Sequence, residues 1–137
     1  MKGKCLCGAI EVVIDDKNEV DICHCSMCRR WSGGPLFTVH GGTTGVKFIG
    51  DKPAAYRSSD WAERGFCATC GTHLFYHLLP TDEYVVLAGL FQEQVQEQDF
   101  QLTTEIFIDE KPSFYELKNE THKMTGQQVF EQFAPKT

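Results

Sequence analysis

Seven cysteines, gathered in three tight groups, constrain this chain more than any other feature. The groups are Cys5 with Cys7, then Cys23, Cys25 and Cys28, then Cys67 with Cys70. Two thiolates one or two residues apart can bind one tetrahedral metal ion, because a short loop directs both sulfurs to a point roughly 2.3 Å from each. The spacing therefore predicts metal binding, with zinc as the expected ion.

A disulfide framework is the alternative explanation for so many cysteines. It would need an oxidising compartment and usually an even cysteine count. The chain has an odd count, and its start, Met1-Lys2-Gly3-Lys4, is not followed by an apolar run of signal-peptide length. No later stretch approaches membrane-spanning length. We therefore expect a cytoplasmic protein with reduced thiols and no membrane partner.

Length and charge limit the classes of protein that remain. The 137 residues are expected to form a single zinc-binding domain over 1–137, which is long enough to bury a core without metal. The formal net charge of −6 disfavours general binding to nucleic acid. An anionic substrate would need locally concentrated basic groups, and Arg29-Arg30 is the clearest such place. Two arginines on a solvated face are the alternative.

The remaining pattern predicts a mainly β domain with little helix. Short apolar or alternating segments between turn signals predict strands at 9–14, 36–40, 46–49, 54–57, 65–67 and 84–91. The segment 84–91 is nearly continuously apolar, which predicts a central strand covered on both faces. Residues 105–108 and 114–117 are expected to pair as a hairpin.

Two segments are expected to depart from this strand pattern. Residues 23–28 contain so many ligand candidates that we expect a metal-binding knuckle or loop rather than regular structure. Near the end of the chain, Thr125 and Gln128 have the spacing of a capping box. They are expected to begin a short helix with Val129, Phe130 and Phe133 on one face.

Seven thiolates suggest one metal site with four ligands and one with three. Four cysteines close the coordination of zinc, whereas three leave a position for water or substrate. Spacing leaves two partitions open. In the first, Cys25, Cys28, Cys67 and Cys70 form the closed site and leave Cys5, Cys7 and Cys23. In the second, which we favour because it keeps the local triplet intact, the outer pairs join and leave Cys23, Cys25 and Cys28.

Three histidines near these cysteines are weighed as further ligands. His24 stands between two cysteines that must both face the metal, so we expect its side chain to point elsewhere. His73 and His77 follow Cys70, but a histidine beside a strand is more often a satisfied polar residue than a ligand. We therefore expect none of the three to coordinate zinc.

The order of the cysteine motifs resembles that of a known family. The motifs are Cys5-Leu6-Cys7-Gly8, then Cys23-His24-Cys25-Ser26-Met27-Cys28-Arg29, then Phe66-Cys67-Ala68-Thr69-Cys70-Gly71-Thr72. They resemble the glutathione-dependent formaldehyde-activating enzyme family, which includes centromere protein V, and the match covers about the first ninety residues. The chain departs from the family at 89–92 and 104–106, where an acidic pair and a histidine are common.

This resemblance implies a fold, a metal content and a reaction. It implies a β-tent fold of short antiparallel strands around two zinc ions. Cys5, Cys7, Cys67 and Cys70 would hold a structural zinc, and Cys23, Cys25 and Cys28 a labile, catalytic one. The family activity adds the thiol of glutathione to formaldehyde, giving S-(hydroxymethyl)glutathione, and is classed as a carbon–sulfur lyase. The implied partners are a small-molecule thiol and an aldehyde.

Secondary roles and competing functions complete the expectations. Arg29 or Arg30 could hold a substrate carboxylate, and backbone N–H groups around Ser32, Gly33 and Gly34 could support a developing oxyanion. The chief alternative is a non-catalytic zinc-binding interaction module. A second alternative is a thiol redox enzyme related to methionine-R-sulfoxide reductases, which would need free cysteines. The pattern predicts no particular oligomeric state.

Overall fold

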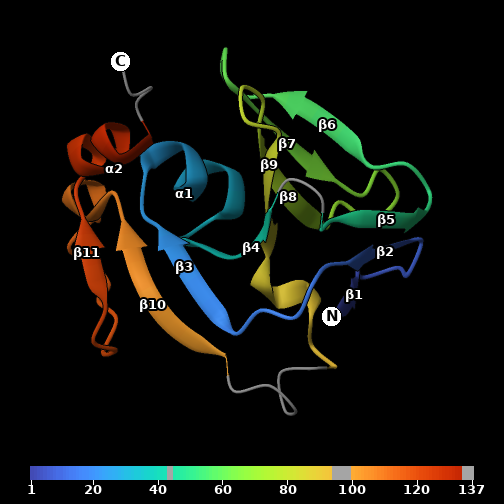
Figure 1. Ribbon diagram of the computed structural model, residues 1–137, viewed down its shortest axis with the longest axis horizontal. Helices are drawn as coiled ribbons and strands as arrows, with labels where there is room; N and C mark the ends of the chain where they lie inside the picture. The colour runs from blue at the N-terminus through green and yellow to red at the C-terminus, as the bar shows by residue number, and fades with distance from the viewer. Residues whose placement is uncertain (43–44, 94–99, 134–137) are drawn as a thin grey trace. The chain divides into compact units, whose positions relative to one another are not determined.

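The computed structural model describes residues 1–42, 45–93 and 100–133, and its regular structure is mainly β (Figure 1). The chain divides into two compact units. The first unit comprises Met1–Asn18 and Thr38–Phe100, and the second comprises Glu19–Phe37 and Gln101–Thr137. No helix among the described residues has the length and apolarity needed to span a bilayer.

The first unit begins with a small antiparallel sheet. Its strand order is β1 (Lys2–Lys4), β2 (Ile10–Val13) and β5 (Lys47–Gly50). Alternate residues of β2 face the core, and Ile10 and Val12 are fully buried. The strand predicted at 9–14 is therefore confirmed, because period-two burial is what its apolar alternation requires.

A second sheet of the first unit carries the longer strands. Its order is β4 (Leu36–Gly42), β9 (Glu83–Leu87), β8 (His73–Leu78), β7 (Ala62–Phe66) and β6 (Ala54–Arg57), and all these neighbours pair antiparallel. The predicted strand at 84–91 is too long, because β9 ends at Leu87 and a 3₁₀ turn, η1, follows at Ala88–Leu90. The turn carries Phe91 into the core, where it is fully buried.

The second unit is built on parallel strands, which the sequence did not predict. The strand β10 (Gln101–Ile106) pairs in parallel with both β3 (Glu19–Cys23) and β11 (His122–Met124), as Figure 1 shows. The predicted hairpin of 105–108 with 114–117 is wrong. Instead β10 ends before Phe107, whose φ of +55° turns the chain into a short 3₁₀ helix, η2, at Ile108–Glu110. The chain then runs back along the sheet before β11 begins, so β10 and β11 point in the same direction.

Two α-helices belong to the second unit. Ser26–Ser32 forms α1, and Gly126–Phe133 forms α2. The predicted capping box is confirmed, because Gln128 N donates to Thr125 Oγ1 at 3.2 Å and Thr125 N donates to Gln128 Oε1 at 2.8 Å. Val129 is buried, whereas Phe130 is 60% exposed. The side chain of Phe133 lies outside the described residues.

Candidate metal centres

Two similar turns hold the outer cysteine pairs in the first unit. Cys5 and Cys7 follow β1, where Gly8 N donates to Cys5 O at 3.1 Å and Gly8 has a φ of +80°. Cys67 and Cys70 follow β7, where Gly71 N donates to Cys67 O at 2.8 Å. Gly71 has a φ of +78°. A positive φ favours glycine, which explains the glycine after each pair.

The outer pairs converge on one point. The thiol sulfurs of Cys5, Cys7, Cys67 and Cys70 all lie within 4.8 Å of one another. Cys7 Sγ is 3.6 Å from Cys5 Sγ and 3.8 Å from Cys67 Sγ. Four sulfurs placed tetrahedrally about 2.3 Å from a zinc ion would be about 3.8 Å apart. The donor set and its spacing therefore fit a closed zinc site.

The thiols of this cluster differ in pKa. Hydrogen bonds from the Thr72 hydroxyl and backbone lower the pKa of Cys70 to about 5. The pKa of Cys7 is raised to about 12. Its backbone contact near Ala9 lowers that pKa, but burial and the neighbouring thiols Cys5, Cys70 and Cys67 together outweigh that contact. The thiolate of Cys70 is thus stabilised by donors from its own turn.

The middle group is held differently, at the junction of a strand and a helix. Cys23 ends β3, Cys25 is the N-cap of α1, and Cys28 lies in the first turn, 4% exposed. Cys25 Sγ accepts a hydrogen bond from Cys28 N at 3.3 Å, as a capping side chain does. The prediction that 23–28 lacks regular structure is therefore wrong, because a helix begins at Ser26 and the cap itself supplies a candidate ligand.

The three sulfurs of the middle group lie within 4.8 Å of one another and form a cluster of their own. The side chains of Cys23 and Cys28, and backbone N–H groups of the helix, lower the pKa of Cys25. The neighbouring thiols Cys25 and Cys28 raise the pKa of Cys23. Cys25 thus loses its proton more readily than Cys23. The structure groups the cysteines as in the second partition described above, and all seven belong to one cluster or the other.

The residue between the first two of these cysteines points away from them. His24 is fully buried, its Nε2 lies 2.8 Å from Glu105 Oε1 and its Nδ1 lies 2.7 Å from Tyr115 Oη. His77 is likewise bonded to carboxylates, at 3.1 Å to Glu63 and 2.6 Å to Asp82. Neither histidine belongs to a cysteine cluster, and the same holds for His73 among the described residues.

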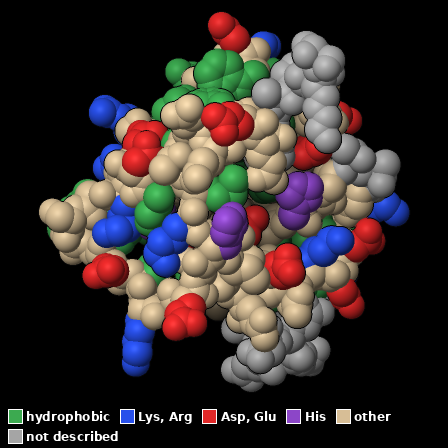
Figure 2. All heavy atoms as spheres, turned by 60° about the vertical axis from the view of Figure 1, so that its left-hand side comes forward, with side chains coloured by type: hydrophobic (Ala, Val, Ile, Leu, Met, Phe, Trp, Pro, Cys, Tyr) green, Lys and Arg blue, Asp and Glu red, His purple; other side chains and the backbone are tan. Residues whose placement is uncertain are grey.

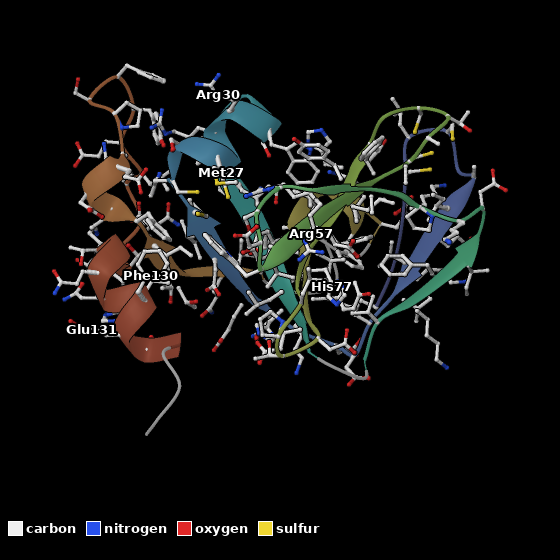
Figure 3. The ribbon with its side chains drawn as sticks, turned by 90° about the horizontal axis from the view of Figure 1, so that it is seen from above. Met27, Arg30, Arg57, His77, Phe130 and Glu131 are labelled. Atoms are coloured by element: carbon white, nitrogen blue, oxygen red, sulfur yellow. The ribbon has the colours of Figure 1, made fainter. Side chains whose placement is uncertain are left out.

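The residues expected to bind substrate lie on α1 and just after it. Arg29 Nε donates to His24 O at 2.9 Å, and this bond holds the Nε end of the Arg29 guanidinium group in place. Arg30 is exposed and projects outward from the helix in Figure 3. Gly33 is the C-cap of α1, with a φ of +81°, and its N–H already donates to Arg29 O at 2.8 Å. The hydroxyl of Ser32 is buried without a hydrogen-bond partner in the described part of the chain.

Glu105 and Tyr115 are the residues that sequence reasoning missed. They are far from His24 in the chain, separated from it by 81 and 91 residues, so no local spacing indicates the contact. The one available signal was an acidic residue inside a predicted strand. Figure 2 shows basic and acidic side chains interspersed over the face that it presents.

Comparisons with known proteins agree with the motif resemblance. The model of the glutathione-dependent formaldehyde-activating enzyme family matches residues 1–110. An uncharacterized lyase of Schizosaccharomyces pombe is 30% identical over 130 residues, which cover 93% of this chain and 93% of that protein. A crystal structure of a Rhodobacter sphaeroides protein is similar with a TM-score of 0.58 and 25% identity. That similarity covers 67% of this chain and 88% of the other.

Proposed function

This chain belongs to the glutathione-dependent formaldehyde-activating enzyme family, and from that premise we propose that it is a zinc-dependent carbon–sulfur lyase. Its reaction would add a thiol, glutathione or a similar molecule, to formaldehyde or another small aldehyde. Two zinc ions are proposed, a structural one in the cluster of four cysteines and a labile one at Cys23, Cys25 and Cys28. The substrates are small molecules.

One observation carries this proposal: the second cluster has three thiols where the first has four. Four thiolates complete a tetrahedral site, whereas three leave one position for a further ligand. Two of the three residues, Cys23 and Cys25, are only half-buried. A small thiol could therefore approach the place where a fourth sulfur would complete the set.

The proposed chemistry is the addition of sulfur to a carbonyl carbon. A zinc ion held by the three thiolates would lower the pKa of a substrate thiol and so supply a thiolate at neutral pH. The new carbon–sulfur bond forms as the carbonyl π bond breaks, and the aldehyde oxygen takes up one proton, which balances the proton that the thiol lost. The reverse reaction cleaves the same bond.

The chain's own residues would bind and orient the substrate. Arg29 and Arg30 are the proposed partners for a substrate carboxylate, with Arg29 held in place by its bond to His24 O. Gly33 is a poor donor to an oxyanion, because its N–H already bonds Arg29 O. Ser32 lies one helical turn after Cys28, on the same face of α1, and its hydroxyl is the donor that we propose in that role.

The test measures exchange between free and thiol-bound formaldehyde. Purified protein of known zinc content is mixed with glutathione and labelled formaldehyde, and magnetisation exchange by NMR reports the rate of formation of the S-hydroxymethyl product. We expect the wild type to accelerate this exchange. Cys25→Ser removes the thiolate that caps α1 and is expected to reduce the rate to that of the uncatalysed reaction.

Met27→Leu is the matched control, because it removes a sulfur from the same helical turn outside the cluster. It is expected to keep the wild-type rate. The proposed reaction would be contradicted if the wild-type protein failed to accelerate exchange with any thiol tested. A folded Cys25→Ser variant as active as the wild type would contradict it as well. The first result, with both zinc ions present, would favour the interaction module.

A further inference from the structure

A single buried residue between two candidate ligands is restrained at every polar atom. The backbone N of His24 donates to Ile106 O at 3.1 Å, and its backbone O accepts from Arg29 Nε at 2.9 Å. Its ring nitrogens contact Glu105 at 2.8 Å and Tyr115 at 2.7 Å. His24 is thus fixed by three separate segments of the second unit, although it is proposed to bind neither metal nor substrate.

The carboxylate that holds His24 is itself buried and fully bonded. Glu105 is 1% exposed, on β10. One carboxylate oxygen, Oε1, is bonded to His24. The other, Oε2, accepts a hydrogen bond from the Thr121 hydroxyl and lies 3.6 Å from Lys123 Nζ. Burial alone raises the pKa of Glu105, but the hydrogen bonds from Thr121 and His24 outweigh burial and lower it. The carboxylate is therefore an ionised acceptor, and Nε2 of His24 donates to it.

The direction of His24 determines the direction of its neighbours. Successive side chains of an extended segment point to opposite sides, so the side chains of Cys23 and Cys25 share the side opposite His24. Cys23 also pairs with Ile106 in the parallel register of β3 and β10. The bonds to its ring and backbone hold His24 in place, and a change in the backbone there would turn both sulfurs away from their common point.

We propose that Glu105 is a positioning residue, which acts through His24 to aim Cys23 and Cys25 at one metal ion and so sets the metal affinity of the triplet. The inference deepens the proposed function, on which its catalytic consequence rests. Residues that orient metal ligands typically change metal affinity by about 10–100-fold when they are removed.

The test compares variants by metal binding rather than by turnover. Zinc affinity is measured by competition with a chromophoric chelator, and cobalt(II) absorption reports the thiolate geometry. Glu105→Ala is expected to weaken the more labile metal about 10–100-fold and to alter its cobalt(II) spectrum, while the tighter metal is retained. Glu105→Gln is expected to recover most of the affinity, because its amide oxygen can still accept from His24 Nε2.

The first unit supplies a matched control. Glu63 contacts His77 at 3.1 Å, in a glutamate–histidine pair that holds no cysteine ligand. Glu63→Ala, the same substitution as in Glu105→Ala, is expected to leave both metal affinities unchanged. If Glu105→Ala does not fold, Tyr115→Phe replaces it, since this variant removes only the hydrogen bond to His24 Nδ1 and is expected to weaken the labile metal as well.

The outcomes separate the two proposals. A folded Glu105→Ala or Tyr115→Phe variant with wild-type zinc affinity and cobalt(II) spectrum would overturn the positioning role, even if the wild type is an active lyase. A weakened labile metal, recovered in Glu105→Gln, supports the positioning role even if the wild type turns over no thiol and aldehyde. In that case only the proposed reaction fails.

Discussion

With a metal ion bound, the two cysteine clusters should contribute unequally to stability, because they would cross-link the chain over different distances. Cys7 and Cys67 are 60 residues apart and meet in the first cluster. By the chain-entropy relation for cross-links, closing a loop of that length contributes about 4 kcal/mol. The triplet spans only residues 23–28, for which the same relation gives about 2 kcal/mol. The first cluster is thus expected to be the stronger stabiliser.

Two double variants test this difference. Cys67→Ser/Cys70→Ser removes one arm of the first cluster, and Cys25→Ser/Cys28→Ser removes two of the three ligands of the second. The pairs are matched in burial, since each contains one buried and one half-buried cysteine. For a chain of this length, each 1 kcal/mol corresponds to about 3–4 °C in Tm. We expect losses of about 15 °C and about 7 °C respectively.

Thermal unfolding followed by far-UV circular dichroism, with zinc counted per chain under reducing conditions, measures both effects. Each double variant should retain one zinc. Equal losses of Tm, or a larger loss for Cys25→Ser/Cys28→Ser, would refute the cross-link argument. Loss of both zinc ions from the triplet variant would also refute it, because the first cluster would then depend on the second.

Three further variants test individual contacts. Gly65→Ala would place a Cβ 2.0 Å from the ring of Phe75, so a loss of about 1–3 kcal/mol is expected in urea unfolding, and an unchanged midpoint would contradict it. Thr125→Ala should cost about 1 kcal/mol by removing the cap of α2, and Thr125→Ser should restore most of it. The pKa of Glu105 is lowered from 4.5, so its stabilising charge is present above pH 4.5 and is lost as pH falls through the folded value. The stability advantage of wild type over Glu105→Gln should therefore shrink on acidification, and a constant difference would argue against it.

The candidate metal site was largely predictable because its signals are local. Cysteines one or two residues apart must share a turn, and a strand such as Ile10–Val13 shows its buried face as alternating apolar residues. The grouping of the outer pairs needed one further step, which was to keep the triplet intact. The structure has this grouping.

The missed features depend on contacts between distant segments. The parallel pairing of β10 with β3 brings together residues about 80 apart, and no turn signal in the sequence marks such a pairing. The helix at Ser26–Ser32 was missed because its N-cap is a cysteine, whose ligand spacing concealed the capping role. Glu105 was missed because its burial follows only from the tertiary fold.

The discontinuous second unit gives the protein an order of assembly during synthesis. The triplet is the first of the two clusters to be complete as the chain leaves the ribosome, well before Cys67 and Cys70 complete the other. The strand that holds His24, however, is made later still, because Glu105 follows Cys28 by more than seventy residues. A nascent chain therefore exposes metal-competent thiols long before it can restrain them. If Glu105 positions His24 as proposed, metal captured early at the triplet would be loose and exchangeable until β10 has paired with β3.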